Sequence, residues 1–392
     1  MREKEAKILP DAVPLPGNNW YAPQYQLPSF HIPTFIELFV KTILFYLHLV
    51  GCSVGISTLT LIEFLSPSSP ILDYLRPRLE EAFGVVLICC FQFFAPSNLF
   101  LYRGEGVEEE ELKIKDEYPP KINMLLGMDK RAVVIANHQL YNDWMVVWSL
   151  AYFNKVHGYI KIVLKKSISK GCVFFKFLFL NRKWEEDKIN MYNQLNELNK
   201  TPENPLWFLL FPEGTTLCEE TRLKSKSFAE KTGQKVFHHL LIPRHLGLYH
   251  SVKELSKTVD YLYDYTIGFS GVPPYKSPQY IYTLASMYIS GINPKQIHIH
   301  IRKFKISEIP LENEEEFAGW LTKRWEEKDE LLDEFYNTGH FPASQRNGVV
   351  EFPTVLNNSV NNLSEILTIW AFSAAIIYIY YLPVKFIWNL IF

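Results

Sequence analysis

The chain has 392 residues, of which 48% are hydrophobic and 15% aromatic, and its formal net charge is only −2. A balance so close to neutral gives no long-range attraction to an anionic surface, so any such attraction must come from local clusters of charge. A nucleic-acid-binding protein would show a basic domain and a recognisable recognition element, and neither is visible. We therefore expect no nucleic-acid partner.

The first hundred residues predict a membrane anchor. Residues 1–34 are polar and then rich in proline, which is typical of an extended arm and not of a signal peptide. Residues 35–65 form an apolar stretch long enough, as a helix, to cross a bilayer. Residues 83–102 are a second candidate, which Pro96, Ser97 and Asn98 weaken at its C-terminal end. We predict that residues 35–102 anchor the chain as a spanning hairpin or a re-entrant pair, with buried core helices as the alternative.

Residues 103–336 carry the pattern of an α/β domain, in which apolar runs of strand length alternate with amphipathic helical stretches. Such alternation favours a mainly parallel sheet covered by helices. Strands are expected near residues 132–136, 160–164, 206–211, 238–243, 262–269 and 297–304. Helices are expected near residues 144–154, 185–200, 221–232, 246–258 and 313–336.

The last part of the chain predicts a linker and a further membrane segment. Residues 337–363 are rich in asparagine, glycine and proline, as linkers are. Residues 364–392 are almost wholly apolar, with Lys385 as their charge near the C-terminus and Pro383 as a break. We expect this segment to enter the membrane.

The heptapeptide from Asn137 to Asp143 places a histidine at a corner between a strand and a helix. The apolar run 132–136 precedes it, and a helical pattern starts at Trp144. On a regular helix, positions i and i+5 point about 140° apart, so His138 and Asp143 can meet only if a turn lies between them. An imidazole oriented by a carboxylate can act as a general base toward an alcohol. Such a pair also arises often by chance, so it does not establish catalysis alone.

A second motif follows the apolar run 206–211. The sequence Phe211-Pro-Glu-Gly-Thr-Thr216 places a carboxylate, a glycine and two hydroxyls at the end of an expected strand. Ligands bind at the carboxyl ends of strands in open α/β sheets. The alternative is an ordinary turn with a solvated glutamate.

Four blocks in order carry a resemblance to a known family. His-x4-Asp (138–143), Phe-Leu-Asn-Arg (179–182), Phe-Pro-Glu-Gly-Thr (211–215) and Leu-Ile-Pro-Arg (241–244) resemble those of the glycerolipid (lysophospholipid) acyltransferases. Asn-Arg-Lys-Trp-Glu-Glu-Asp (181–187) is similar to the lysocardiolipin and lysophosphatidylinositol acyltransferase branch. One departure is Gly171, which lies eleven residues before Arg182, whereas the wider family has a glycine closer to this arginine.

The resemblance implies a reaction and a set of site residues. His138 would deprotonate the free hydroxyl of a lysophospholipid, which attacks the thioester of acyl-coenzyme A, while Asp143 orients the imidazole. Acyl-coenzyme A is a co-substrate, and neither a metal nor another cofactor is expected. The implied acceptor site comprises Arg182 on the phosphate, Glu213, Gly214 and Thr215 around the glycerol phosphate, and Pro243 and Arg244 at the rim.

Two further clusters allow more than one interpretation. Residues 155–188 interleave nine lysines and arginines with phenylalanines, which suits lipid head groups and coenzyme A phosphates, or a basic face beside a phenylalanine core stripe. His298 and His300 alternate on an expected strand and could bind a metal, but satisfied structural histidines are the commoner outcome.

The sequence thus predicts an enzyme that acylates an anionic lysophospholipid such as lysophosphatidylinositol, with membrane lipids as its environment. We place it in the endoplasmic reticulum membrane with the domain facing the cytosol, where acyl-coenzyme A is available. Two alternatives stay open at this point. They are a coenzyme-A-independent phospholipid transacylase and a membrane scaffold that keeps the fold without the chemistry.

Overall fold

A computed structural model describes the α/β domain and part of what precedes it. The described ranges are residues 94–112, 126–166, 177–181, 184–274, 276–342 and 349–352, together with single positions elsewhere. The predicted arm (1–34), nearly all of the first apolar segment (35–65) and nearly all of the segment 364–392 lie outside the described residues.

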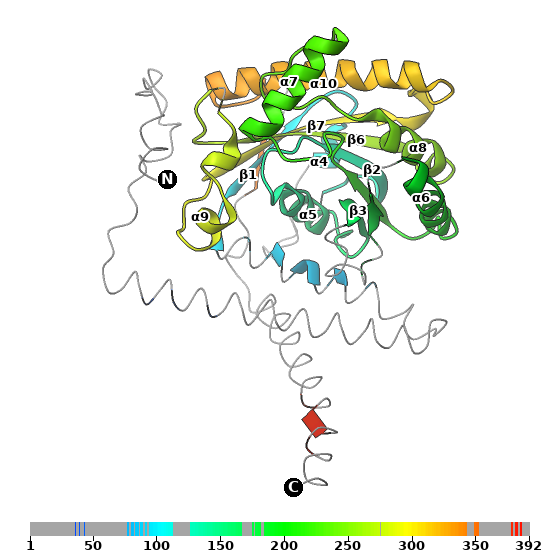
Figure 1. The fold of residues 1–392 in the computed structure, drawn as a ribbon. Coiled ribbons are helices and arrows are strands. Elements are labelled where there is room, and N and C mark those ends of the chain that lie inside the picture. Colours follow the sequence, from blue (N-terminus) through cyan, green and yellow to red (C-terminus); the bar gives the residue numbers. More distant parts are fainter. Residues whose placement is uncertain are drawn as a thin grey trace.

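One mixed sheet of eight strands forms the centre of the domain (Figure 1). Its spatial order is β4-β3-β5-β2-β6-β7-β1-β8. Pairings from β4 through β6 are all parallel, β6 pairs antiparallel with β7, β7 pairs parallel with β1, and β8 is an antiparallel edge strand. The strands are β1 (Asn98–Arg103), β2 (Arg131–Ala136), β3 (Ile160–Lys165), β4 (Leu178–Leu180), β5 (Leu206–Leu210), β6 (Tyr261–Phe269), β7 (Gln296–Lys305) and β8 (Val349–Phe352). The prediction of a mainly parallel sheet is confirmed.

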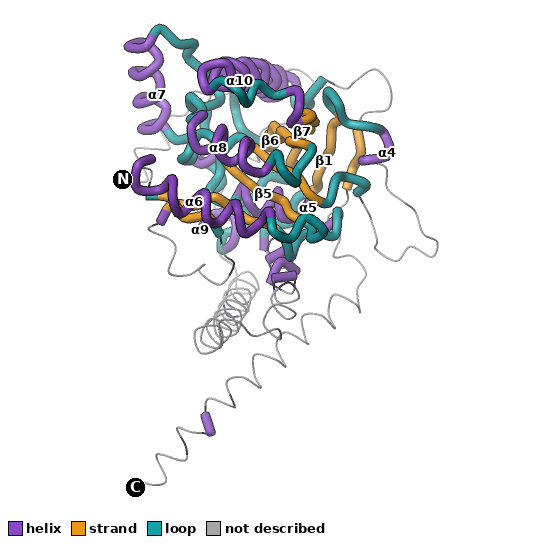
Figure 2. Tube along the Cα trace, turned by 90° about the vertical axis from the view of Figure 1, so that its right-hand side faces the viewer, coloured by secondary structure: helices purple, strands orange, loops and turns teal. Residues whose placement is uncertain are grey.

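The central strands are continuous apolar runs because both of their faces are covered. All five residues of β5 and five of the six in β2 are buried. Such runs are typical of parallel strands that lie between two layers of helices. Helix α10 crosses one face of the sheet, and α5 lies on the opposite face (Figures 1 and 2). The helices are α4 (Glu109–Leu112), α5 (Asp143–Phe153), α6 (Trp184–Asn199), α7 (Glu219–Thr232), α8 (His245–Leu255), α9 (Leu284–Tyr288) and α10 (Glu314–Thr338).

The second predicted membrane segment, 83–102, is wrong at its C-terminal end. Residues from Asn98 onward form β1, which pairs in parallel with β7 inside the sheet. The helical positions before it end near Phe94, and Ser97 donates a hydrogen bond to the carbonyl of Pro294 at 2.6 Å. The proline at position 96 interrupts the helical pattern, and the alternating residues Leu99 and Leu101 bury one face of a strand.

The described helical positions before β1 pack against the domain. Glu80 is buried and accepts a hydrogen bond from the Lys161 ammonium on β3 at 2.9 Å. The ring of Phe83 lies 6.3 Å from that of Trp148 on α5, centroid to centroid. Within the described part of the chain, no helix is both long enough and apolar enough to span a bilayer.

The expected strand at 238–243 is also wrong, because this segment is a loop. Its backbone N–H groups are bonded to side chains instead of a neighbouring strand: those of His238 and His239 to the Asp329 carboxylate, that of Leu241 to Glu213, and that of Ile242 to the Ser225 hydroxyl. Apolar residues such as Leu240 are buried, although their backbone is not paired with a neighbouring strand. In addition, β8 lies within the predicted linker 337–363.

Candidate active site

The turn between β2 and α5 brings His138 and Asp143 into contact, as the sequence predicted. His138 Nδ1 lies 3.1 Å from Asp143 Oδ2. The same oxygen accepts the backbone N–H groups of Gln139 at 2.6 Å and Leu140 at 2.9 Å. Asp143 is the first residue of α5 and is fully buried. We refer to residues 137–143 as the catalytic turn.

These contacts fix which nitrogen of His138 carries the proton. Asp143 Oδ2 already accepts two backbone N–H groups, so the proton shared with the imidazole lies on Nδ1, which donates to the carboxylate. Burial raises the pKa of Asp143, and the hydrogen bonds from His138, Leu140 and Gln139 oppose that rise. In this tautomer Nε2 carries a lone pair, and the Thr216 hydroxyl lies 3.2 Å from it. That arrangement is the one a general base needs.

The His138 ring is held in place yet reachable. It stacks on Phe211 with ring centroids 4.5 Å apart, and 18% of its side chain is exposed. Asn137, next in the chain, is fully buried and exchanges two hydrogen bonds with the backbone of Ile267 on β6, at 3.0 and 2.7 Å. The catalytic turn is thus fixed to the neighbouring strand on one side and to the Phe211 ring on the other.

Glu213 organises the site through the backbone. Its side chain is buried, with 2% exposed. One carboxylate oxygen accepts the N–H of His138 at 3.0 Å, and the other accepts the N–H of Leu241 at 3.0 Å. Burial raises the pKa of Glu213 to about 8, and these two bonds lower it. Glu213 therefore joins its own block (211–215) to the first block (138–143) and to the fourth block (241–244). Any effect of Glu213 on the shape of a substrate pocket comes from holding these segments in place.

Gly214 and the residues of the fourth block form the neighbouring turn. Gly214 has a φ of 69°, in the left-handed region that glycine favours, and its N–H donates to the carbonyl of Phe211 at 2.9 Å. The Arg244 N–H donates to the carbonyl of Pro212 at 2.8 Å, which joins the two blocks. Pro243 is buried, Arg244 is exposed and Thr215 is half-buried.

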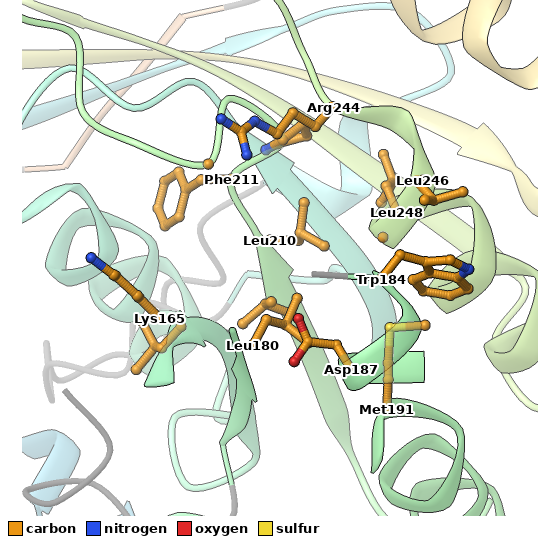
Figure 3. Close-up of a pocket in the computed structure, with 15 residues that line it drawn as sticks. Lys165, Leu180, Trp184, Asp187, Met191, Leu210, Phe211, Arg244, Leu246 and Leu248 are labelled. Carbon is orange, nitrogen blue, oxygen red and sulfur yellow. The ribbon is translucent and has the colours of Figure 1, made fainter. Parts of the chain in front are cut away.

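A pocket of about 230 Å³ lies beside this turn (Figure 3). Its walls are mostly apolar, and its polar side chains include those of Lys165, Asp187 and Arg244. The first turn of α8 contributes Leu246 and Gly247, so the positive end of that helix faces the pocket region. Phe211 lines the pocket and stacks on His138, so the pocket adjoins the catalytic turn.

Comparison with known proteins decides the family. A family model described as "Acyltransferase" matches residues 111–269, and one described as "Acyltransferase C-terminus" matches residues 287–363. An uncharacterized acyltransferase of Schizosaccharomyces pombe is 37% identical over 279 residues, which cover 67% of this chain and 75% of the relative. The chain belongs to the lysophospholipid acyltransferase family.

Two further relatives carry substrate names. The 2-acyl-1-lysophosphatidylinositol acyltransferase of Saccharomyces cerevisiae is 38% identical, over 56% of this chain and 65% of that protein. Lysocardiolipin acyltransferase 1 of Gallus gallus is 35% identical, over 54% of this chain and 55% of that protein. Together with the family models, they establish that this chain is an O-acyltransferase.

In this acyltransferase, α10 supports the catalytic turn from outside the four motif blocks. The Tyr336 hydroxyl donates to the Gln139 side-chain oxygen at 2.6 Å, across 197 residues of sequence. The Gln139 amide in turn donates to the carbonyl of His239 at 3.0 Å. Asp329, also on α10, accepts the N–H of His239 at 2.7 Å. Helix α10 falls within the region matched by the C-terminal family model.

The sequence placed Thr216 next to the third block but assigned it no contact, and it gave no role to Gln139, Asp329 or Tyr336. Gln139 lies within the first motif, so its position was the available signal. The sequence carried no signal for Asp329 and Tyr336, because both belong to an amphipathic helix that is far from the motifs in the chain. Arg182 lies outside the described residues. Leu180 and Trp184, which flank it in sequence, both line the pocket.

Parts of the two ambiguous clusters are structural. Phe175 and Phe177 are buried core residues, and Lys161 is paired with Glu80, so the phenylalanine stripe in 155–188 belongs to the core. His298 is buried, and its Nδ1 lies 2.7 Å from the Tyr102 hydroxyl. Across the described ranges, no group of three or more histidine, cysteine or acidic side chains is arranged to hold a metal ion.

Proposed function

We propose that this acyltransferase transfers the acyl group of acyl-coenzyme A to the free hydroxyl of an anionic lysophospholipid, with lysophosphatidylinositol as the first candidate. The observation that carries the proposal is the His138 imidazole, whose Nδ1 lies 3.1 Å from Asp143 Oδ2 and whose ring stacks on Phe211, a residue that lines the pocket. The names of the relatives support a lysophospholipid acceptor with an acidic head group.

The reaction follows from the geometry of the catalytic turn. The lysolipid hydroxyl would take a position next to Nε2 like that of the Thr216 hydroxyl, which lies 3.2 Å away. As Nε2 accepts the proton, the lysolipid oxygen attacks the thioester carbonyl carbon, and Asp143 stabilises the imidazolium that forms. An ester bond forms, the thioester bond breaks, and the departing thiolate takes the proton back to give free coenzyme A.

The pocket supports an acceptor that has both an anionic group and an apolar part. Lys165 and Arg244 place two cationic side chains on a pocket whose walls include Leu180, Leu210 and Leu246. Arg182 belongs to the segment between two pocket residues, and a guanidinium binds phosphate with two parallel hydrogen bonds. Asp187 adds one carboxylate to the same pocket, and we propose that the cationic side chains bind the phosphate.

The proposed location is the endoplasmic reticulum membrane with the domain on the cytosolic side. Acyl-coenzyme A is available there, and a membrane-bound enzyme can meet a lysolipid without extracting its acyl chain fully into water. That extraction costs about 0.8 kcal/mol for each methylene group.

A panel of lysolipids tests donor and acceptor together. Membranes that contain the full chain are incubated with lysophosphatidylinositol, lysophosphatidic acid, lysocardiolipin or lysophosphatidylcholine, with and without acyl-coenzyme A. We expect acylated product only with acyl-coenzyme A and faster turnover of the anionic acceptors. Transfer without acyl-coenzyme A would instead indicate a transacylase, and equal rates with lysophosphatidylcholine would contradict the anionic acceptor.

A further inference from the structure

A long stretch of this chain contains no acidic residue. Aspartate and glutamate account for 42 of the 392 residues, yet none occurs between Asp264 and Glu308. Part of this stretch is the sheet strand β7, and the remainder, residues 270–295, lies between β6 and β7. From residue 276 to residue 295 the charged side chains are Lys276 and Lys295 alone.

This segment presents large apolar side chains to the outside. Tyr280 is 59% exposed, and Leu284 and Ile289 are each 50% exposed. Tyr141, from the catalytic turn, is 60% exposed. We call these four residues the α9 patch. Leu284 lies in α9, Tyr280 and Ile289 lie next to that helix in the chain, and Tyr141 comes from the catalytic turn.

The segment is held firmly, so its exposed side chains are not the result of a loose loop. Tyr282 and Met287 are buried among the core residues, and the Tyr282 hydroxyl donates to the carbonyl of Ser270 at 2.7 Å. The Thr283 side chain caps α9 by accepting the N–H of Ser286 at 3.0 Å. The patch is therefore displayed on a fixed scaffold.

The patch is also joined to the catalytic turn. The Tyr141 N–H donates to the side-chain oxygen of Gln279 at 3.1 Å, and the Asn142 amide lies 3.4 Å from the Tyr288 hydroxyl. The Ser277 hydroxyl donates to the carbonyl of Leu217, whose own N–H bonds the carbonyl of His138. A surface that contacts the patch would thus lie beside the site where the acceptor hydroxyl must arrive.

We propose that the α9 patch docks the catalytic domain on the surface of a phospholipid bilayer with anionic head groups. Tyrosine side chains suit the head-group level of a membrane, and leucine and isoleucine suit the boundary with the acyl chains. The two lysines attract anionic lipid, and the segment itself adds no carboxylate that would repel it. The inference rests on the proposed function, in which the acceptor is a lipid.

Photo-cross-linking tests the contact without relying on activity. A benzophenone-bearing phenylalanine replaces Leu284 in the full chain, which is then irradiated in membranes. The same amino acid replaces Ile189 as a control, because Ile189 is 67% exposed on α6, at the opposite end of the domain in Figure 1. We expect phospholipid adducts from position 284 and few from 189. A cross-linked second copy of the chain from position 284, or equal lipid adducts from both positions, would overturn the proposal.

Kinetics provide an independent test. The double variant Leu284→Ser/Ile289→Ser is assayed with lysolipid embedded in anionic vesicles and with a short-chain lysolipid that stays monomeric, and Ile189→Ser serves as the control. Because two apolar side chains are lost from the contact, we expect about a ten-fold lower rate on vesicles and little change with the monomer. Equal losses in both assays would contradict docking. If the unaltered chain acylates neither lysolipid, the proposed function fails, and the cross-linking result alone judges the patch.

Discussion

Replacing Asp143 by asparagine should abolish most of the activity and leave the fold intact. The amide oxygen can take the place of Oδ2 and keep the bonds from the Gln139 and Leu140 N–H groups. The amide nitrogen then takes the place of Oδ1, which has no hydrogen-bond partner within the described residues. Burial raises the pKa of Asp143, and the hydrogen bonds from His138, Leu140 and Gln139 oppose that rise. The buried amide nitrogen is then a donor without an acceptor among the described residues, so we expect the free energy of unfolding to fall by about 1–3 kcal/mol, which leaves the fold in place.

The loss of activity follows from the charge that asparagine lacks. Unit charges 3.1 Å apart, the distance from His138 Nδ1 to Asp143 Oδ2, attract by about 5 kcal/mol at an effective dielectric constant of about 20. The imidazolium forms only partly in the transition state, so a somewhat smaller share of this energy is lost. We expect kcat to fall by about 10³-fold, since each 1.36 kcal/mol corresponds to a factor of ten.

The assay follows coenzyme A release and the thermal unfolding midpoint for Asp143→Asn and for Asp333→Asn. Asp333 is the matched control, because its carboxylate also pairs with a histidine, His239 at 3.2 Å, and makes no hydrogen bond or ion pair with His138. The control should keep kcat within about two-fold. A loss below about ten-fold for Asp143→Asn, or a loss that comes with a collapsed unfolding midpoint, would refute an electrostatic role for Asp143.

Three further substitutions test other parts of the site. Tyr336→Phe leaves the buried Gln139 oxygen without its donor, so the free energy of unfolding should fall by about 1–3 kcal/mol, measured by denaturation, and kcat should fall several-fold. Burial raises the pKa of Glu213 from 4.5 to about 8, so its neutral form stabilises the fold fully below pH 4.5, and this contribution is lost as the pH rises through 8. Glutamine at position 213 does not titrate, so the unfolding midpoint of Glu213→Gln should decline less than that of the unaltered protein between pH 4.5 and pH 8. Equal declines in the two proteins would contradict the raised pKa of Glu213. Arg182→Lys should raise the apparent KM for the lysolipid more than that for acyl-coenzyme A, because an ammonium cannot form two parallel bonds to phosphate. Equal effects on both substrates would indicate a structural role.

The parts of the site that could be predicted are those within one turn of the chain. His138 and Asp143 are five positions apart, and the flanking strand and helix patterns fixed the corner between them. The contacts that hold this turn could not be predicted in the same way. The partner of Glu213 at Leu241 and the bond from Tyr336 to Gln139 depend on how distant segments pack, and a single sequence carries no signal for such contacts.

The errors in the fold have a common physical origin. An apolar run indicates that a segment is buried, but it does not indicate which groups its backbone N–H and C=O groups bond to. Residues 238–243 are apolar because they lie in the core, but side chains such as Asp329 and Glu213 satisfy their N–H groups. Residues 98–102 continue an apolar run past Pro96, and they are buried in the sheet as β1.

The most direct test of the central claim is the rate of acyl transfer in His138→Ala membranes, measured as acylated lysolipid and as released coenzyme A. His340→Ala, which removes an exposed histidine from the loop after α10, is the matched control. If His138 takes the proton from the acceptor hydroxyl, His138→Ala should lose at least about 100-fold in rate while His340→Ala keeps the full rate. Full transfer by His138→Ala membranes would contradict the mechanism.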